Sequence, residues 1–95
     1  MKKAVTIELD KARNLRYGIN AIILVEELIG KSITQLDLNT LSFKSIRDMI
    51  YAGLVHEDPD LTPNYVGVLI DEFSDITHMI EKMSEAIELA FGSKN

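Results

Sequence analysis

Two carboxylates and one histidine have the spacing of a metal or acid–base site. Glu72, Asp75 and His78 are three residues apart, so a helix would place them on part of one face. The pair Asp75 and His78 matches half of the carboxylate–histidine pattern that holds metals inside helix bundles. A complete site needs a second helix of this kind, and the sequence has none. We therefore expect a solvated acidic face with one polar histidine, and no metal.

Two other segments begin like ligand-binding loops and then depart from the pattern. Residues 58–62 have the alternating oxygen side chains that open a calcium loop, but Pro63 occupies the glycine position and Leu69 the position of the closing acid. Residues 30–32, Gly-Lys-Ser, match the end of a phosphate loop, but Val25 stands where its first glycine belongs. The serines lack histidine–acid support, and cysteine is absent. We therefore predict that the protein is not an enzyme and uses no cofactor.

Composition and charge narrow the choice of partner. The 95 residues suit one domain, and without Trp its core must rely on aliphatic side chains and methionine. Residues 1–55 carry eight basic and six acidic side chains, a net +2, whereas residues 56–95 carry two and nine, a net −7. The acidic part repels phosphate, so we expect no nucleic-acid partner.

The basic residues near the N-terminus are few, and we expect them to protect a solvated strand edge. They are Lys2, Lys3, Lys11, Arg13 and Arg16. The sequence shows no secretory segment and no membrane span. We therefore expect a cytoplasmic protein with no membrane partner.

The N-terminal half predicts a strand or hairpin followed by an apolar helix. Residues 4–9 are β-branched and partly alternating, and residues 15–17 are either a return strand or the lead into a helix. Residues 19–29 form a helix that is apolar almost all round, so we expect it to be central and covered on several sides. Gly30 is its stop signal. Residues 32–38 are either one helical turn or an extended connector.

The next helix begins at Ser42, whose hydroxyl is a suitable N-cap. Its spacing places apolar residues on one packed face: Phe43, Ile46, Ile50 and Leu54. Three charged residues are expected to point outward: Lys44, Arg47 and Asp48. Thr62-Pro63 is a strong start signal for a further helix. The chain then either starts again at Ser74 or continues as one long helix.

These elements predict a mainly α fold: a short N-terminal β-strand or hairpin followed by four to five helices in one small domain. Within residues 1–95 we expect the strand or hairpin at 1–17, a helical bundle at 18–91 and a frayed tail at 92–95.

The last helix carries the stripe that we take as the candidate partner-binding surface. Its apolar residues recur at helical spacing: Met79, Ile80, Met83, Ile87 and Phe91. Its acidic rim would supply solubility and orientation: Glu81, Glu85 and Glu88. The stripe is either an interface, for a partner helix or for self-association, or part of the protein's own core.

Four motifs follow one another along the chain. They are Arg13-x-Leu15-Arg16-Tyr17-Gly18-x-Asn20-Ala21, Glu26-Glu27-Leu28-Ile29-Gly30-Lys31-Ser32, Arg47-x-x-Ile50-x-Ala52-Gly53-Leu54 and Leu61-Thr62-x-x-Tyr65-Val66-Gly67-x-Leu69-Ile70-Asp71. In this order they resemble the tail assembly chaperones of long-tailed bacteriophages and gene transfer agents. The resemblance covers residues 5–72, and the final helix agrees in character only.

The resemblance implies a non-enzymatic factor in the morphogenesis of phage or prophage virions. Such proteins bind the long, helix-rich tape measure protein in the cytoplasm of the bacterial host and help to recruit tail tube subunits. It implies the tape measure and tail tube proteins as partners, and self-association into an oligomer is compatible with it. The alternative is a small bacterial or prophage regulatory adaptor, or a DNA-associated helical protein using the helices at 42–54 and 62–72. Against that alternative, the second of these helices offers Asn64 and otherwise apolar or acidic groups.

Overall fold

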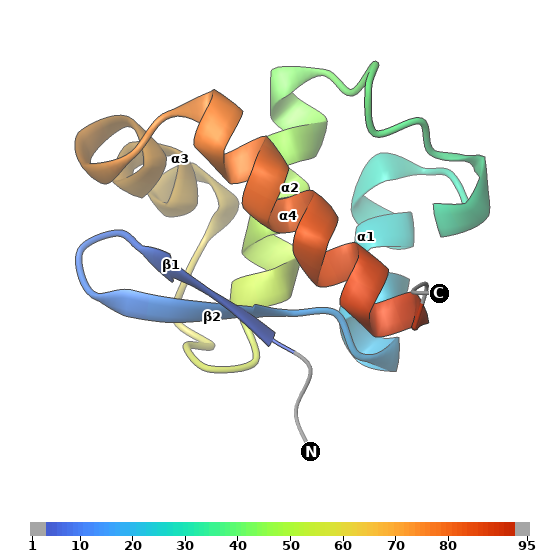
Figure 1. The fold of residues 1–95 in the computed structure, drawn as a ribbon, viewed down its shortest axis with the longest axis horizontal. Coiled ribbons are helices and arrows are strands. Elements are labelled where there is room, and N and C mark those ends of the chain that lie inside the picture. The colour runs from blue at the N-terminus through green and yellow to red at the C-terminus, as the bar shows by residue number, and fades with distance from the viewer. Residues whose placement is uncertain (1–3, 93–95) are drawn as a thin grey trace.

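The computed structural model describes residues 4–92 and confirms the mainly α fold with an N-terminal hairpin. One two-stranded antiparallel sheet precedes four α-helices and one short 3₁₀ turn around a single core (Figure 1). The elements are β1 (Ala4–Glu8), β2 (Ala12–Arg16), α1 (Ile19–Ile29), the 3₁₀ turn η1 (Ile33–Gln35), α2 (Phe43–Leu54), α3 (Pro63–Phe73) and α4 (Ile76–Phe91). Lys2, Lys3 and residues 93–95 of the expected frayed tail lie outside the described residues, whereas Gly92 ends α4 with a left-handed φ of 66°.

The hairpin buries one face and leaves the other in solvent. Ile7 and Leu15 point into the core and are 1% and 0% exposed. On the outer face the Thr6 hydroxyl donates to Asn14 Oδ1 at 2.7 Å, across a directly opposed pair of residues. The return strand is therefore present but begins at Ala12, earlier than the sequence indicated. Strand alternation explains which side chains face the helices.

The helix α2 is the centre of the fold, and Figure 1 shows it behind α4, with α1 and α3 on either side. It contacts α1, α3, α4 and β2. Its start follows the predicted cap, because Ser42 Oγ accepts from the Ser45 backbone N–H at 3.1 Å. Met49 and Ile50, both 0% exposed, anchor the core beneath it.

The helix α1 has the predicted bounds but is peripheral, so the expectation of a central helix that is covered on several sides is wrong. It packs mainly on α2 and ends at Gly30, whose φ is 81°. Val25 is its one fully buried residue, while Ile19 is 74% exposed. An all-round apolar pattern indicates many contact faces, but only the neighbouring elements decide how many are covered.

The last two helices are separate. Thr62 Oγ1 accepts from the Tyr65 N–H at 3.1 Å, so α3 begins at Pro63 as predicted. The chain is extended at Ser74, and Asp75 Oδ1 accepts from the His78 N–H at 2.8 Å. A second helix therefore starts here, one residue later than the sequence indicated, with Asp75 as its N-cap.

A close approach at Gly53 brings β2 and the residue after it onto α2. A Cβ added to Gly53 would lie 2.9 Å from Leu15 Cδ2 and 2.9 Å from Tyr17 Cζ. The Tyr17 hydroxyl donates to the Met49 carbonyl at 2.7 Å, which fixes the ring against this glycine. Because these side chains are buried, neither can move aside.

Replacing Gly53 by alanine should therefore destabilise the domain although it raises helix propensity. Overpacking of this kind costs about 1–3 kcal/mol, which chemical denaturation would detect. Gly67→Ala is the matched control, because its added Cβ would meet only the flexible Arg47 side chain at 3.4 Å. That control should be neutral or stabilising by up to about 1 kcal/mol. Equal stability of both variants would contradict the close packing at Gly53.

Tyr17 should make the domain sensitive to alkali. Burial raises the pKa of the Tyr17 phenol far above its ordinary value of 10.0. The contribution of the protonated Tyr17 phenol to the free energy of unfolding is intact below pH 10 and is lost as the pH rises further. The reason is that this phenol ionises in the unfolded chain but stays protonated in the folded one. Tyr17→Phe should lose about 1 kcal/mol at neutral pH and show a flatter decline above pH 10. Unfolding free energy measured against pH tests this, with the exposed Tyr65→Phe as a control that keeps the wild-type profile.

Candidate functional site

The structure divides the candidate stripe on α4 between core and surface. Met79 and Met83 are 0% exposed and Ile87 is 8% exposed, so these three side chains pack inside the domain. Ile80 is partly buried, whereas Phe91 is 54% exposed. The interpretation of the stripe as core therefore holds for Met79, Met83 and Ile87, which offer no contact surface while the domain is folded. The sequence left both interpretations open because core and contact helices share the same apolar period.

The predicted acidic rim is on the surface. Glu81, Glu85 and Glu88 are exposed along the outer side of α4. Lys82 Nζ lies 3.7 Å from Glu85 Oε2, a surface pair that contributes little to stability. The acidic rim thus lies on the solvent side of α4, and the opposite side of this helix packs in the protein's own core.

Two of the residues tested for metal chemistry, Asp75 and Asp58, have structural roles. Asp75 caps α4, and Glu72 and His78 are exposed beside it. Asp58 is engaged in hydrogen bonds to Asp60 N–H at 3.2 Å and to Arg13 at 3.2 Å. Within residues 4–92, no group of three histidine, aspartate or glutamate side chains could hold a metal ion.

Arg13 is buried, which corrects the expectation that it belongs to a solvated basic edge. Its guanidinium donates to both carboxylate oxygens of Asp10, at 2.8 and 2.9 Å, and to Asp58 Oδ2 at 3.2 Å. The guanidinium bonds lower the pKa of the Asp10 carboxyl below its usual range. The same bonds raise the pKa of Arg13. Asp10, in the hairpin turn, and Asp58, in the segment before α3, therefore compensate the buried positive charge of Arg13. The acidic residues around Asp58 were the available signal in the sequence for a partner of this kind.

The segment between α2 and α3, which contains Asp58, also covers the outer edge of β2. Glu57 accepts from the Asn14 backbone N–H at 3.1 Å and from its side-chain amide at 2.8 Å. His56 Nε2 lies 2.8 Å from the Asn14 carbonyl oxygen. These contacts satisfy strand groups that would otherwise be open for pairing. The two residues directly before the segment that looked like a calcium loop thus close a sheet edge.

Asp48 is buried, which corrects its predicted outward position. It is 1% exposed and accepts from Lys44 Nζ at 2.8 Å and from Arg47 at 2.9 and 3.1 Å. Arg47 also donates to Asn64 Oδ1 at 3.2 Å, which connects α2 to α3. Because α3 packs beside α2, the face that carries Asp48 is covered even though its residue pattern is polar.

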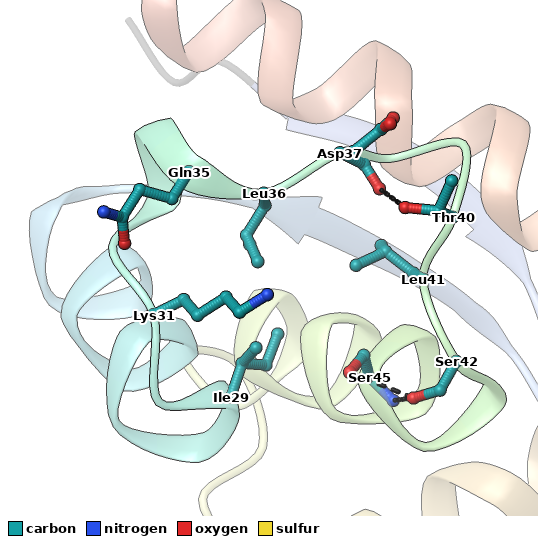
Figure 2. A pocket seen from close by; sticks show the side chains of 9 residues that line it. All are labelled: Ile29, Lys31, Gln35, Leu36, Asp37, Thr40, Leu41, Ser42 and Ser45. Carbon is teal, nitrogen blue, oxygen red and sulfur yellow. Dashed lines mark hydrogen bonds between the residues drawn. The ribbon is translucent and has the colours of Figure 1, made fainter.

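One hollow lies under the segment between α1 and α2 (Figure 2). It measures about 310 Å³ and is lined by Ile29, Lys31, Gln35, Leu36, Asp37, Thr40, Leu41, Ser42 and Ser45. Figure 2 shows the Lys31 amino group reaching toward its middle and the Gln35 amide turned away. The Ser42 and Ser45 hydroxyls at its end bond each other at 3.1 Å, and Ser42 also caps α2. Its polar groups therefore mainly hold the connecting segment in place.

A second hollow, the Phe43 groove, runs between the first turn of α2 and the junction of α3 with α4. It measures about 500 Å³ and is lined by Phe43, Lys44, Arg47, Gly67, Ile70, Asp71, Ser74, Asp75 and Ile76. Phe43 is 73% exposed, which corrects its expected place on the packed face of α2. It is the first residue of the helix and projects beyond the elements that cover Ile46, Ile50 and Leu54. Sequence periodicity indicates the direction in which a side chain points, but it does not indicate how far along the helix the neighbouring elements extend.

Large apolar side chains are exposed on all four helices. They are Ile19 and Ile23 on α1, Phe43 on α2, Tyr65, Val68 and Phe73 on α3, and Leu89 and Phe91 on α4. On α3, the proposed DNA-reading helix, the exposed side chains include tyrosine and valine, and Asn64 is bonded to Arg47. Such a surface suits contact with protein better than contact with base edges.

Comparisons with known proteins add no relative. No family model matches the chain, and neither the curated proteins nor the solved structures contain a match. Among the described helices, none combines the length and the apolar character needed to cross a membrane.

Replacing Met83 by aspartate should unfold the domain rather than alter a surface. A charge at a site that is 0% exposed adds a desolvation penalty to the lost packing, a cost of about 4 kcal/mol or more. Phe91→Ser, on the same helix but half exposed, should cost less than about 1 kcal/mol. Thermal unfolding followed by circular dichroism distinguishes them. A folded Met83→Asp variant of near wild-type stability would restore the interface interpretation of the whole stripe.

Proposed function

We propose that this chain is a non-enzymatic tail assembly chaperone of a phage or prophage. It binds the helix-rich tape measure protein in the cytoplasm of the bacterial host and helps to recruit tail tube subunits during tail morphogenesis. The proposal rests on the motif resemblance, and two properties of the structure support it.

The observation that carries the proposal is the contact of two of the four motifs in space. The first motif supplies Leu15 and Tyr17, which lie against Gly53 of the third motif. Arg13 of the first motif also bonds Asp58, in the turn that precedes the fourth motif. Two motifs that are individually weak therefore lie in direct contact, which is compatible with their being packing signatures.

The surface has the chemistry that such a chaperone needs. A partner rich in amphipathic helices must be covered by apolar side chains on the chaperone while it waits for assembly. The exposed aliphatic and aromatic residues of α1 to α4 supply these contacts. The net charge of −5 favours the solubility of a protein with such patches.

Co-expression with a tape measure candidate tests the function. The candidate is the product of the longest helix-rich reading frame encoded beside this gene, and the measurement is its soluble yield and its co-elution with this chain. We expect the soluble yield to rise several-fold over expression of the candidate alone. An unrelated acidic helical protein of similar size is the control, because it supplies charge without the contact surface.

Two results would contradict the proposed function. One is the absence of any long helix-rich frame beside the gene together with the absence of a tail tube gene. The other is a tape measure candidate whose solubility is the same with this chain, with the control protein and alone.

A further inference from the structure

The Phe43 groove lies beside a protruding side chain of the size that the groove accepts. Phe43 is 73% exposed at its rim, and the cap from Ser42 to Ser45 fixes the helix turn that carries it. The groove holds about 500 Å³. A cavity of about 150 Å³ is enough for a benzene ring. The groove is therefore large enough for a phenyl side chain from another molecule.

The floor of the groove is apolar. Ile70 is 5% exposed and Ile76 is partly buried against the core. Gly67 contributes no side chain, and the Arg47 side chain lies over it, since an added Cβ would lie 3.4 Å from Arg47 Cδ. The groove therefore offers an inserted ring aliphatic contacts below and polar groups only at its walls.

The two walls carry opposite charges. Lys44 and Arg47 stand on the α2 side, next to Phe43, and their two positive charges exceed the one negative charge of Asp48, with which both pair. Asp71 and Asp75 stand on the side formed by α3 and the start of α4. Figure 1 shows the first turns of α2 and α4 at the same end of the molecule. Asp71 has no ion-pair or hydrogen-bond partner among residues 4–92.

We propose that the Phe43 groove is a self-association surface, in which Phe43 of each of two copies enters the groove of the other. A two-fold interface uses the same patch on both copies, so the patch must be self-complementary. This one carries both the projecting ring and the space for it. The two-fold arrangement also sets the basic wall of each copy against the acidic wall of the other. A groove with walls of one sign would repel its own copy.

The proposal does not depend on the proposed chaperone function. A dimer formed through this groove leaves the exposed apolar residues at other sites, such as Ile19 and Phe91, available to a partner. Its tests use the purified chain alone, so their failure is distinguishable from a failure to bind a tape measure protein.

Sedimentation equilibrium of the purified chain over a wide concentration range is the first test. We expect a monomer–dimer equilibrium whose dissociation constant rises at least tenfold in Phe43→Ser, because a central aromatic anchor is lost. Ile19→Ser is the matched control, since Ile19 is 74% exposed and lies on α1, away from the groove lining. The control should dimerise like the wild type. A monomeric wild type at all concentrations, or equal dimerisation of Phe43→Ser and wild type, overturns the proposal.

A charge-reversal mixture tests the geometry. Lys44→Glu alone sets two acidic side chains against each other across each half of the interface, and Asp71→Lys alone sets two basic ones. Each variant should therefore dimerise at least tenfold more weakly than the wild type. Mixing the two should restore a heterodimer, because every opposed pair then has opposite signs. Failure of the mixture to dimerise while both variants are folded overturns the two-fold arrangement.

Thermal unfolding of both charge variants accompanies the mixing experiment. Lys44 also pairs with the buried Asp48 at 2.8 Å, so Lys44→Glu places a second carboxylate near it. If that variant loses its fold, the comparison of Phe43→Ser with Ile19→Ser decides the proposal, because no hydrogen bond or ion pair of the described residues uses the Phe43 side chain.

Discussion

The close approach of the hairpin to α2 at Gly53 is the constraint on which the remaining structure depends. With no side chain at this position, Leu15 and Tyr17 lie directly on the helix, and the Tyr17 hydroxyl bonds the Met49 carbonyl. This contact makes α2 the common support of the sheet and the other helices. Because dense packing transmits displacements, a shift here would move the hairpin, the covering α4 and the core between them.

Polar contacts at the far end of the hairpin hold the sheet in place together with that apolar contact. The buried guanidinium of Arg13 joins Asp10 in the hairpin turn to Asp58 in the segment before α3. Glu57 and His56 close the outer edge of β2 through Asn14. One face of the small sheet is thereby held by packing and one edge by charge-assisted hydrogen bonds, which are stronger than neutral ones. A two-stranded hairpin alone would be marginal in water.

The same architecture determines which side chains remain at the surface. The core takes up the methionines and most aliphatic residues of α4. The two buried charged residues, Arg13 and Asp48, are paired with less buried side chains. What remains outside is a set of aromatic and aliphatic side chains among acidic residues, with one groove of opposed charges. This arrangement supports recognition of other protein surfaces, whether of a partner or of a second copy.

Local chemistry in the sequence determined the starts of α2 and α3 and the end of α1. Ser42 and Thr62 predicted two helix starts, Gly30 predicted the end of α1, and the alternation of residues 4–9 predicted a strand. These signals are visible in the sequence because caps and stops depend on residues within one or two turns. Only the tertiary structure decided that Asp48 and Arg13 are buried, that Phe43 is exposed and that Met83 is core. Each of those outcomes depends on which distant segment covers the side chain, and periodicity carries no information about that.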